Sequence, residues 1–225
     1  LHELANWPDL KALRDLQATW TLDDWHSPHL QAVLKDIATD RKATRRRARA
    51  MALLAVLARA WPQLSDVAEV TAAHDYDGWK LRGTTRAWWL WAAADVPWLD
   101  SATAIPTSPQ ALRVRTAATL AVHGDKPETF LHAAFRTARP DVLTALGVAG
   151  EPDTRELVSR LQQLRDADQQ DDAITSDVYI AYQALSERAS QPRRTSDLST
   201  PKLRELFAHG QGLVLSKHGW RPPID

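Results

Sequence analysis

The stretch LAVHGDKP, residues 120–127, and its near copy LGVAGEP, residues 146–152, decide the expected fold. Each stretch has a leucine, a glycine four positions later, then an acidic residue and a proline. Glycine readily takes the left-handed conformation that ends many helices, and proline suits the first turn of the next helix. The pattern therefore predicts a helix, a tight turn and a second helix that packs back against the first.

Two looser copies, LWAAADVP at 90–97 and LSERASQP at 185–192, extend the pattern along the chain, with alanine replacing glycine. The leucines that open the four copies lie 30, 26 and 39 residues apart, so the spacing is irregular. A pair of helices leaves an apolar face that only a neighbouring pair can cover. We therefore expect the units to stack into an irregular array.

The stretch from about Ala111 to Leu164, and more loosely that from Ala43 to Pro109, resembles HEAT-like α-α repeats. The resemblance rests on a helix rich in small residues, a glycine followed by an acid and proline, and then a leucine-spaced helix. It implies an all-α fold, an α-solenoid. We expect a helical repeat domain over residues 1–192. Residues 193–225 are expected to form a linker, a short helix and a non-helical C-terminal arm.

Helical periodicity also marks the N-terminal half of the chain. It predicts helices from about Asn6 to Trp20, from Pro28 to Thr39 and from Arg41 to Leu64, and a shorter one from Val67 to Ala73. The helix ending near Leu64 is the best supported, and Pro62 is expected to stop it. Its apolar stripe consists of Ala50, Leu53, Leu54, Leu57 and Trp61.

Composition narrows the classes of protein to which the chain can belong. It has 225 residues, no cysteine and a formal net charge of zero. The missing cysteines exclude disulfides, thiolate metal sites and cysteine nucleophiles, and the neutral charge argues against an overall attraction to nucleic acid. The longest apolar run, Ala87 to Ala94, is far shorter than the roughly 20 residues that span a bilayer. We therefore expect a cytoplasmic protein without a membrane partner, whose natural chain begins upstream of Leu1.

Six cations fall within nine residues at the start of the helix expected over Arg41 to Leu64. A helix N-terminus disfavours cations, so a function for these charges is one interpretation, and phosphate or nucleic-acid binding is the function that suits them. The other interpretation is a solvated face that pairs with Asp36, Asp40 or the acidic stretch 166–172. The candidate anion-binding residues are Arg41, Lys42, Arg45, Arg46, Arg47 and Arg49, with Arg113 and Arg115 from a later helix.

Three tryptophans crowd into four residues at the start of WWLWAAAD, residues 88–95. This predicted helix presents apolar residues on almost all of its sides, so core packing is the default interpretation. The alternative is an exposed partner-binding face of Arg86, Trp88, Trp89 and Trp91, since tryptophan and arginine concentrate binding energy. Asp95, four residues after Trp91, is placed to accept a hydrogen bond from its indole.

No sequence motif for a catalytic or cofactor site occurs. The chain has no phosphate loop, no glycine-rich nucleotide fingerprint and no nucleophile elbow. His74 beside Asp75, His26 with His29 and the acidic stretch 166–172 lack the remaining parts of a catalytic or metal site. We therefore predict no catalytic residues, no cofactor and no metal.

Three functions remain open at this point. The first is a non-enzymatic helical-repeat interaction module that binds a protein partner. The second is a nucleic-acid-binding repeat protein that uses the basic run at 41–49. The third is implied by similarity to the HEAT-like alkylpurine DNA glycosylases, which hold a damaged nucleotide with residue types found here at Trp88, Trp91, Asp95 and Arg115. We favour the first, a binding protein rather than an enzyme.

Overall fold

The computed structural model describes residues 19–22, 24, 27–76, 79–167, 172–190, 205, 207, 213–216 and 219–221. The chain is mostly helical, as predicted, with seven α-helices among these residues and several short strands. It divides into two compact units. Unit 1 comprises residues 1–113 and 127–148, and unit 2 comprises residues 114–126 and 149–225.

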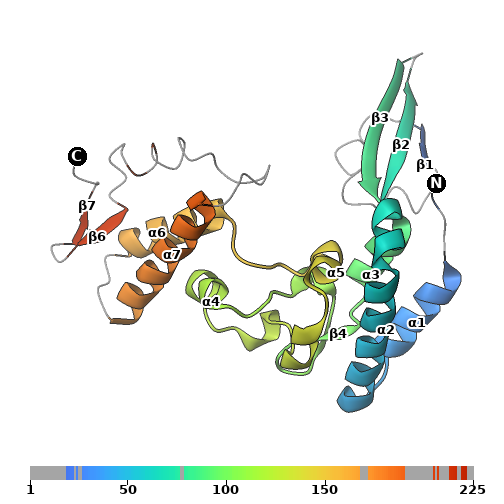
Figure 1. Ribbon diagram of the computed structural model, residues 1–225, viewed down its shortest axis with the longest axis horizontal. Coiled ribbons are helices and arrows are strands. Elements are labelled where there is room, and N and C mark those ends of the chain that lie inside the picture. The colour runs from blue at the N-terminus through green and yellow to red at the C-terminus, as the bar shows by residue number, and fades with distance from the viewer. Residues whose placement is uncertain are drawn as a thin grey trace. The chain divides into compact units, whose positions relative to one another are not determined.

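Two packed helices form the frame of unit 1 (Figure 1): α1 at Pro28–Ala38 and α2 at Ala43–Leu64. Ser27 caps α1, because its side chain accepts a hydrogen bond from the Leu30 backbone N–H at 3.3 Å. Both helices lie where the sequence predicts them, although Pro62 sits inside the last turn of α2 instead of ending it. The expected apolar stripe of α2 is buried, apart from the half-buried Leu53.

Unit 1 also contains a three-stranded antiparallel sheet. Its strands are β1 (Thr19–Leu22), β2 (Glu69–Tyr76) and β3 (Trp79–Arg86), paired in that order. The predicted helix over Val67–Ala73 is therefore wrong: a single 3-10 turn, η3 (Ser65–Val67), leads directly into β2. The helix expected over Asn6–Trp20 lies mostly outside the described residues, and its last two positions belong to β1.

The rest of unit 1 consists of short elements that enclose a dense core. Trp89, Trp98, Phe130 and Phe135 are its largest fully buried side chains. The elements are α3 (Trp88–Asp95), β4 (Leu99–Asp100), β5 (Pro106–Thr107), η4 (Pro109–Ala111), η5 (Pro127–Thr129), η6 (Ala133–Thr137) and α5 (Pro140–Ala145). Bridges from Ser101 to Leu131 and from Arg113 to Phe130 connect them across the sequence.

In unit 2, two helices pack on a third. They are α4 (Ala117–His123) and α6 (Thr154–Asp166), and both contact α7 (Asp172–Ser190). Capping boxes begin α4 and α6. A small hairpin, β6 (Val214–Ser216) and β7 (Gly219–Arg221), contributes Leu215 to the core of this unit. The Tyr182 hydroxyl donates to the Leu213 carbonyl at 2.5 Å and accepts from the Leu215 N–H at 2.9 Å.

The repeated motif marks helix ends better than helix pairs. α3 ends at Asp95, and α4 ends at His123, followed by its C-cap Gly124 with a φ of 72°. The copy at 146–152 is followed by an α-helix, α6, and the residues directly after the copy at 185–192 lie outside the described part of the chain. The copy at 90–97 leads into β4, and the copy at 120–127 leads into a 3-10 turn. The second helix predicted for those two copies is wrong, because extended and 3-10 segments take its place, and the stacked HEAT-like array stays a prediction.

Most of residues 193–225 lie outside the described part of the chain. The described pieces of this stretch include β6 and β7, which are not helical. The proposed division at residue 192 and the arm stay predictions. No described helix combines the length and the apolar character that crossing a membrane requires.

Candidate functional site

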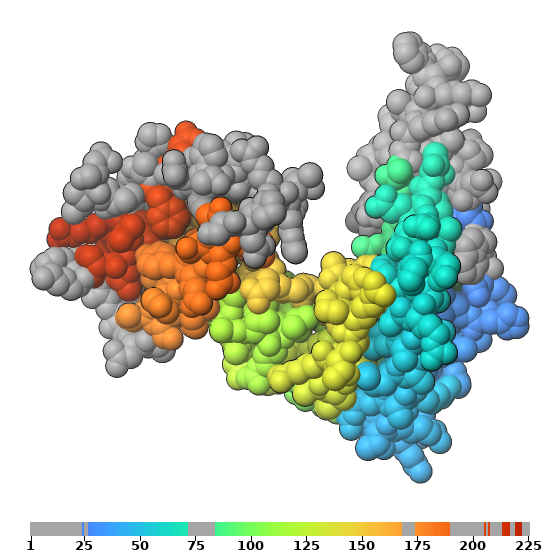
Figure 2. Space-filling model, in the orientation of Figure 1, coloured from blue at the N-terminus to red at the C-terminus, as the bar shows by residue number. Residues whose placement is uncertain are grey.

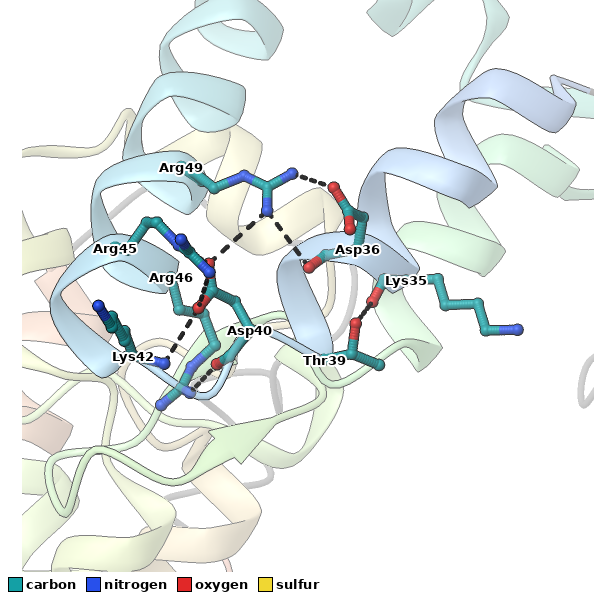
Figure 3. Close-up of polar contacts among 8 residues, drawn as sticks. All are labelled: Lys35, Asp36, Thr39, Asp40, Lys42, Arg45, Arg46 and Arg49. Carbon is teal, nitrogen blue, oxygen red and sulfur yellow. Dashed lines mark hydrogen bonds and ion pairs between the residues drawn. The ribbon is translucent and has the colours of Figure 1, made fainter.

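The basic run at 41–49 lies at the start of α2, where part of it faces the end of α1 (Figure 3). Arg45 forms a two-pronged contact with Asp40, from Nε to Oδ2 at 2.5 Å and from Nη2 to Oδ1 at 3.0 Å. Arg49 pairs with Asp36. The pairing with Asp36 and Asp40 that the sequence offered as the alternative to phosphate binding is therefore confirmed.

Arg46 and Arg47 reach a carboxylate that lies far along the sequence, that of Asp100 in β4. Arg46 Nε donates to Asp100 Oδ1 at 2.6 Å, and Arg47 Nη1 donates to Oδ2 at 3.3 Å. Arg46 also donates to the carbonyls of Asp40 and Ala104, each at 2.7 Å. Asp100 is 0% exposed and Arg46 is 4% exposed, so this ion pair belongs to the interior.

Asp40 connects the two groups of contacts. Hydrogen bonds from the Arg45 side chain lower the pKa of Asp40 from 3.8 to about 2; desolvation opposes this shift, and the Lys42 backbone and the Arg49 charge reinforce it. Asp40 is therefore a carboxylate at neutral pH, and its charge offsets part of the basic run. The Arg41 and Lys42 side chains, both exposed, make no ion pair within the described residues.

The outer face of α2 is a feature that the sequence reasoning missed. At 100° per residue, the exposed positions of α2 share one side of the helix, opposite the buried stripe. The centre of this face is apolar and consists of Ala48, Ala52, Ala55 and Val56, with Val56 58% exposed. Arg45 and Arg59 lie at its two ends. The whole helix contains no Asp or Glu. Alanines at helical spacing between arginines were the available signal.

Figure 2 shows α2, coloured from cyan to teal, as part of the uncovered surface of unit 1. The opposite side of α2 carries the buried residues, and α2 contacts α1, α5 and β4. An exposed, largely apolar helix face between two cations is suited to contact with another macromolecule, because isolated apolar residues are common on surfaces but grouped ones mark interaction sites.

The tryptophan cluster is mostly structural. Trp88 is 8% exposed and Trp89 is 1% exposed, so the interpretation as core packing is confirmed for both. The Trp89 indole donates to the Val67 carbonyl at 3.2 Å. Trp91 and Arg86 are half-buried and remain candidates for partner contact. The predicted acceptor role of Asp95 toward the Trp91 indole is wrong: its carboxylate accepts from Gln110 Nε2 at 2.9 Å.

Arg113 and Arg115 fall in different units, and Arg115 lies outside the unit that holds the basic run. Arg115 belongs to unit 2, and its Nη2 donates to both carboxylate oxygens of Asp125, at 2.9 and 3.0 Å. Arg113 belongs to unit 1, where its backbone bonds to Thr129 and Leu131. Both arginines precede α4, which begins at Ala117 and is capped by Thr116.

A hollow of about 340 Å³ lies in unit 2 between the end of α4 and one side of α6. α4 contributes Val122 and His123, and the α6 residues that line it are mostly polar. His123 Nε2 lies 3.6 Å from Glu156 Oε1 across the hollow. This is the second candidate site.

Neither histidine candidate gains support as a catalytic or metal site. His74 and Asp75 are neighbouring residues of β2, and their side chains lie outside the described part, as does His26. Among the described residues, no group of three or more His, Cys, Asp or Glu side chains is arranged to hold a metal ion. Most of the acidic stretch 166–172 also lies outside them.

We compared the chain with family models, with curated proteins and with solved structures, and no match was found in any of the three comparisons.

Proposed function

We propose that this chain is a non-enzymatic interaction module that binds a protein partner through the outer face of α2. The observation that carries this proposal is the composition of that face, with an exposed apolar centre, an arginine at each end and no acidic residue on the helix. Such a surface gains free energy when its apolar centre leaves water. Arg59, which makes no ion pair within the described residues, can bond to a partner at the rim.

The dimensions of the face suit a protein surface. From Arg45 to Arg59 the face is about 21 Å long at 1.5 Å per residue, which matches the reach of a partner helix or sheet edge. Ala48, Ala52 and Ala55 present little side-chain bulk, so a partner backbone can approach closely. Val56 adds the largest exposed apolar side chain of the face.

The geometry favours a protein over nucleic acid. Arg45, Arg46, Arg47 and Arg49 already bond to carboxylates, so their charges are partly offset before any phosphate arrives. Binding to a phosphate backbone draws on uncompensated cations. Burial of Trp88 and Trp89 also removes them as stacking platforms for nucleobases, which weakens both the nucleic-acid and the glycosylase alternatives.

Site-directed photo-crosslinking tests the proposal. A photoreactive amino acid at position 56 in the full chain is expected to trap a protein partner in native lysate, and Ala52→Glu is expected to reduce that adduct strongly, because it adds a charge to the apolar centre. The same photoreactive group at position 128, an exposed site in η5, is the matched control. Equal adducts at positions 56 and 128, or an adduct at 56 that Ala52→Glu leaves unchanged, would refute the assignment of this face.

A second measurement, of DNA binding, distinguishes the proposed protein-binding function from the nucleic-acid alternative. We expect no binding of short duplex or single-stranded DNA at low or at moderate salt. Strong, salt-sensitive binding that is lost with Arg41→Gln and Lys42→Gln would overturn the proposal in favour of nucleic acid. These two positions are chosen because substitutions there leave the ion pairs of Asp40 and Asp100 in place.

A further inference from the structure

The hollow beside α6 holds polar groups of two kinds, those already bonded within unit 2 and those that are not. Arg160 belongs to the first kind: its Nε donates to the Ala121 carbonyl at 2.9 Å and its Nη2 lies 3.5 Å from Asp177 Oδ2. It therefore satisfies a carbonyl near the end of α4 and fixes that end against α6.

Glu156 is also bonded within the unit. Its Oε2 accepts from the Asp153 backbone N–H at 2.9 Å, which completes the capping box of α6. Its Oε1 faces His123 Nε2 at 3.6 Å. The Glu156 carboxylate is thus engaged by the cap of α6 within the unit.

The second kind of group forms a row along α6. Arg155, Ser159 and Gln163 line the hollow at intervals of four residues, and all three are exposed. Within the described residues, none of these side chains makes a hydrogen bond or an ion pair. An interval of four residues is about 6 Å along a helix, so the row is about 12 Å long.

This spacing resembles that of an extended chain. In an extended peptide, groups on one side recur every two residues, or roughly 6.6 Å. Three donors spaced about 6 Å apart can therefore each contact one two-residue repeat of such a peptide. Arg155, at one end of the row, offers a guanidinium that suits a carboxylate through two parallel hydrogen bonds.

We propose that this hollow binds an extended peptide segment carrying a carboxylate, with Arg155 pairing with that carboxylate and Ser159 and Gln163 bonding to the peptide backbone. The volume of about 340 Å³ lies at the small end of the range for ligand sites, which suits a few residues of a peptide. The site belongs to unit 2, so its existence does not depend on the face of α2.

The test is a titration of the full, isotope-labelled chain with three probes. Binding is measured by the chemical-shift changes of the backbone amide signals. The probes are a blocked pentapeptide with one central glutamate, the same peptide with glutamine, and acetate. The glutamate peptide is expected to shift amides of α4 and α6 saturably. Its dissociation constant should be about three- to fivefold lower than that of the glutamine peptide at low salt.

Arg155→Gln is expected to abolish the preference for glutamate over glutamine. Arg136→Gln, at an exposed arginine of η6 in unit 1, is the matched control and is expected to preserve it. The amide spectrum of each free variant shows that it is folded. Ser159→Ala is expected to weaken both peptides equally, because Ser159 bonds to the backbone.

Three results would overturn the proposal: no saturable shift with the glutamate peptide, equal affinity of the wild-type chain for both peptides, or affinity for acetate as high as for the peptide. The last result would mean that the hollow takes a small free acid. Failure of crosslinking at α2 would not affect any of these measurements, so the two proposals fail separately.

Discussion

Asp100→Asn tests whether the buried ion pair organises unit 1. The substitution keeps the shape of the side chain and removes its charge. Arg46, only 4% exposed, then keeps its bonds to the carbonyls of Asp40 and Ala104 but loses its carboxylate. Arg47 loses the same partner. The variant therefore contains a buried cation whose charge is no longer balanced.

Removal of one member of a buried ion pair costs about 3 to 5 kcal/mol. The two carbonyl bonds that Arg46 keeps place the expected loss in free energy of unfolding near the lower limit, about 3 kcal/mol. For a chain of this length, 1 kcal/mol corresponds to a change in Tm of about 2 to 4 °C. Asp100→Asn is thus expected to lower Tm by about 6 to 12 °C.

Urea unfolding followed by tryptophan emission measures the effect, because Trp89 and Trp98 are fully buried in the same unit as Asp100. Asp141→Asn is the matched control, since the Arg139–Asp141 pair is exposed on both sides, and no measurable change in the urea midpoint is expected.

A loss in free energy of unfolding below about 1 kcal/mol with Asp100→Asn would refute the reasoning. It would mean that water solvates the charge of Arg46 in place of the carboxylate. A loss that disappears in high salt would also refute the reasoning, since salt screens exposed pairs much more than buried ones. The double variant Arg46→Met with Asp100→Leu provides a further check: it should recover part of the stability that Asp100→Asn loses, because no unbalanced charge is left in the interior.

Two more predictions concern stability. The pKa of Asp40 is lowered in the folded state, from 3.8 to about 2, so its contribution is complete above about pH 4 and disappears as the pH falls through 2. The advantage of the wild-type chain over Asp40→Asn in urea unfolding should therefore shrink between pH 4 and pH 2, and a constant difference would contradict the pairing with Arg45. Gly147→Ala should lower stability by about 1 kcal/mol or more, because Gly147 has a φ of 90° and an added Cβ would lie 3.2 Å from Gln110 Cβ. At Gly150 an added Cβ would meet nothing within 4 Å, so Gly150→Ala should change the stability little in thermal melts. A larger loss of stability with Gly150→Ala than with Gly147→Ala would contradict the backbone conformation described for Gly147.

The sequence predicted the helices whose signals are local. α1 carries its own cap and proline at Ser27–Pro28, and α2 carries an apolar stripe at helical spacing. The sheet was missed because residues 69–86 contain few apolar residues in strict alternation. The available signal was Asp77-Gly78, a dipeptide that favours tight hairpin turns, between two stretches that contain Val70, Thr71, Thr84 and Thr85.

The partners of the basic run were predicted only where they are near in sequence. Asp36 and Asp40 follow from the geometry of a helical hairpin, and both were named as alternatives. Asp100 is 54 residues from Arg46, and the path between them includes a hairpin and α3 that sequence periodicity did not place. The hollow beside α6 was also missed, because its lining combines two helices from separate stretches of the chain.

The chain path has a consequence for any attempt to map binding by truncation. Unit 1 is completed by residues 127–148, which come after the first stretch of unit 2. A fragment that stops at Arg113 lacks Phe130 and Phe135, two of the largest side chains in the core of unit 1. A fragment that begins at Ala149 lacks α4, on which α7 packs. Neither unit can be excised as one continuous piece, so loss of binding in a deletion series would report a damaged fold, and point substitutions are needed to locate a binding surface.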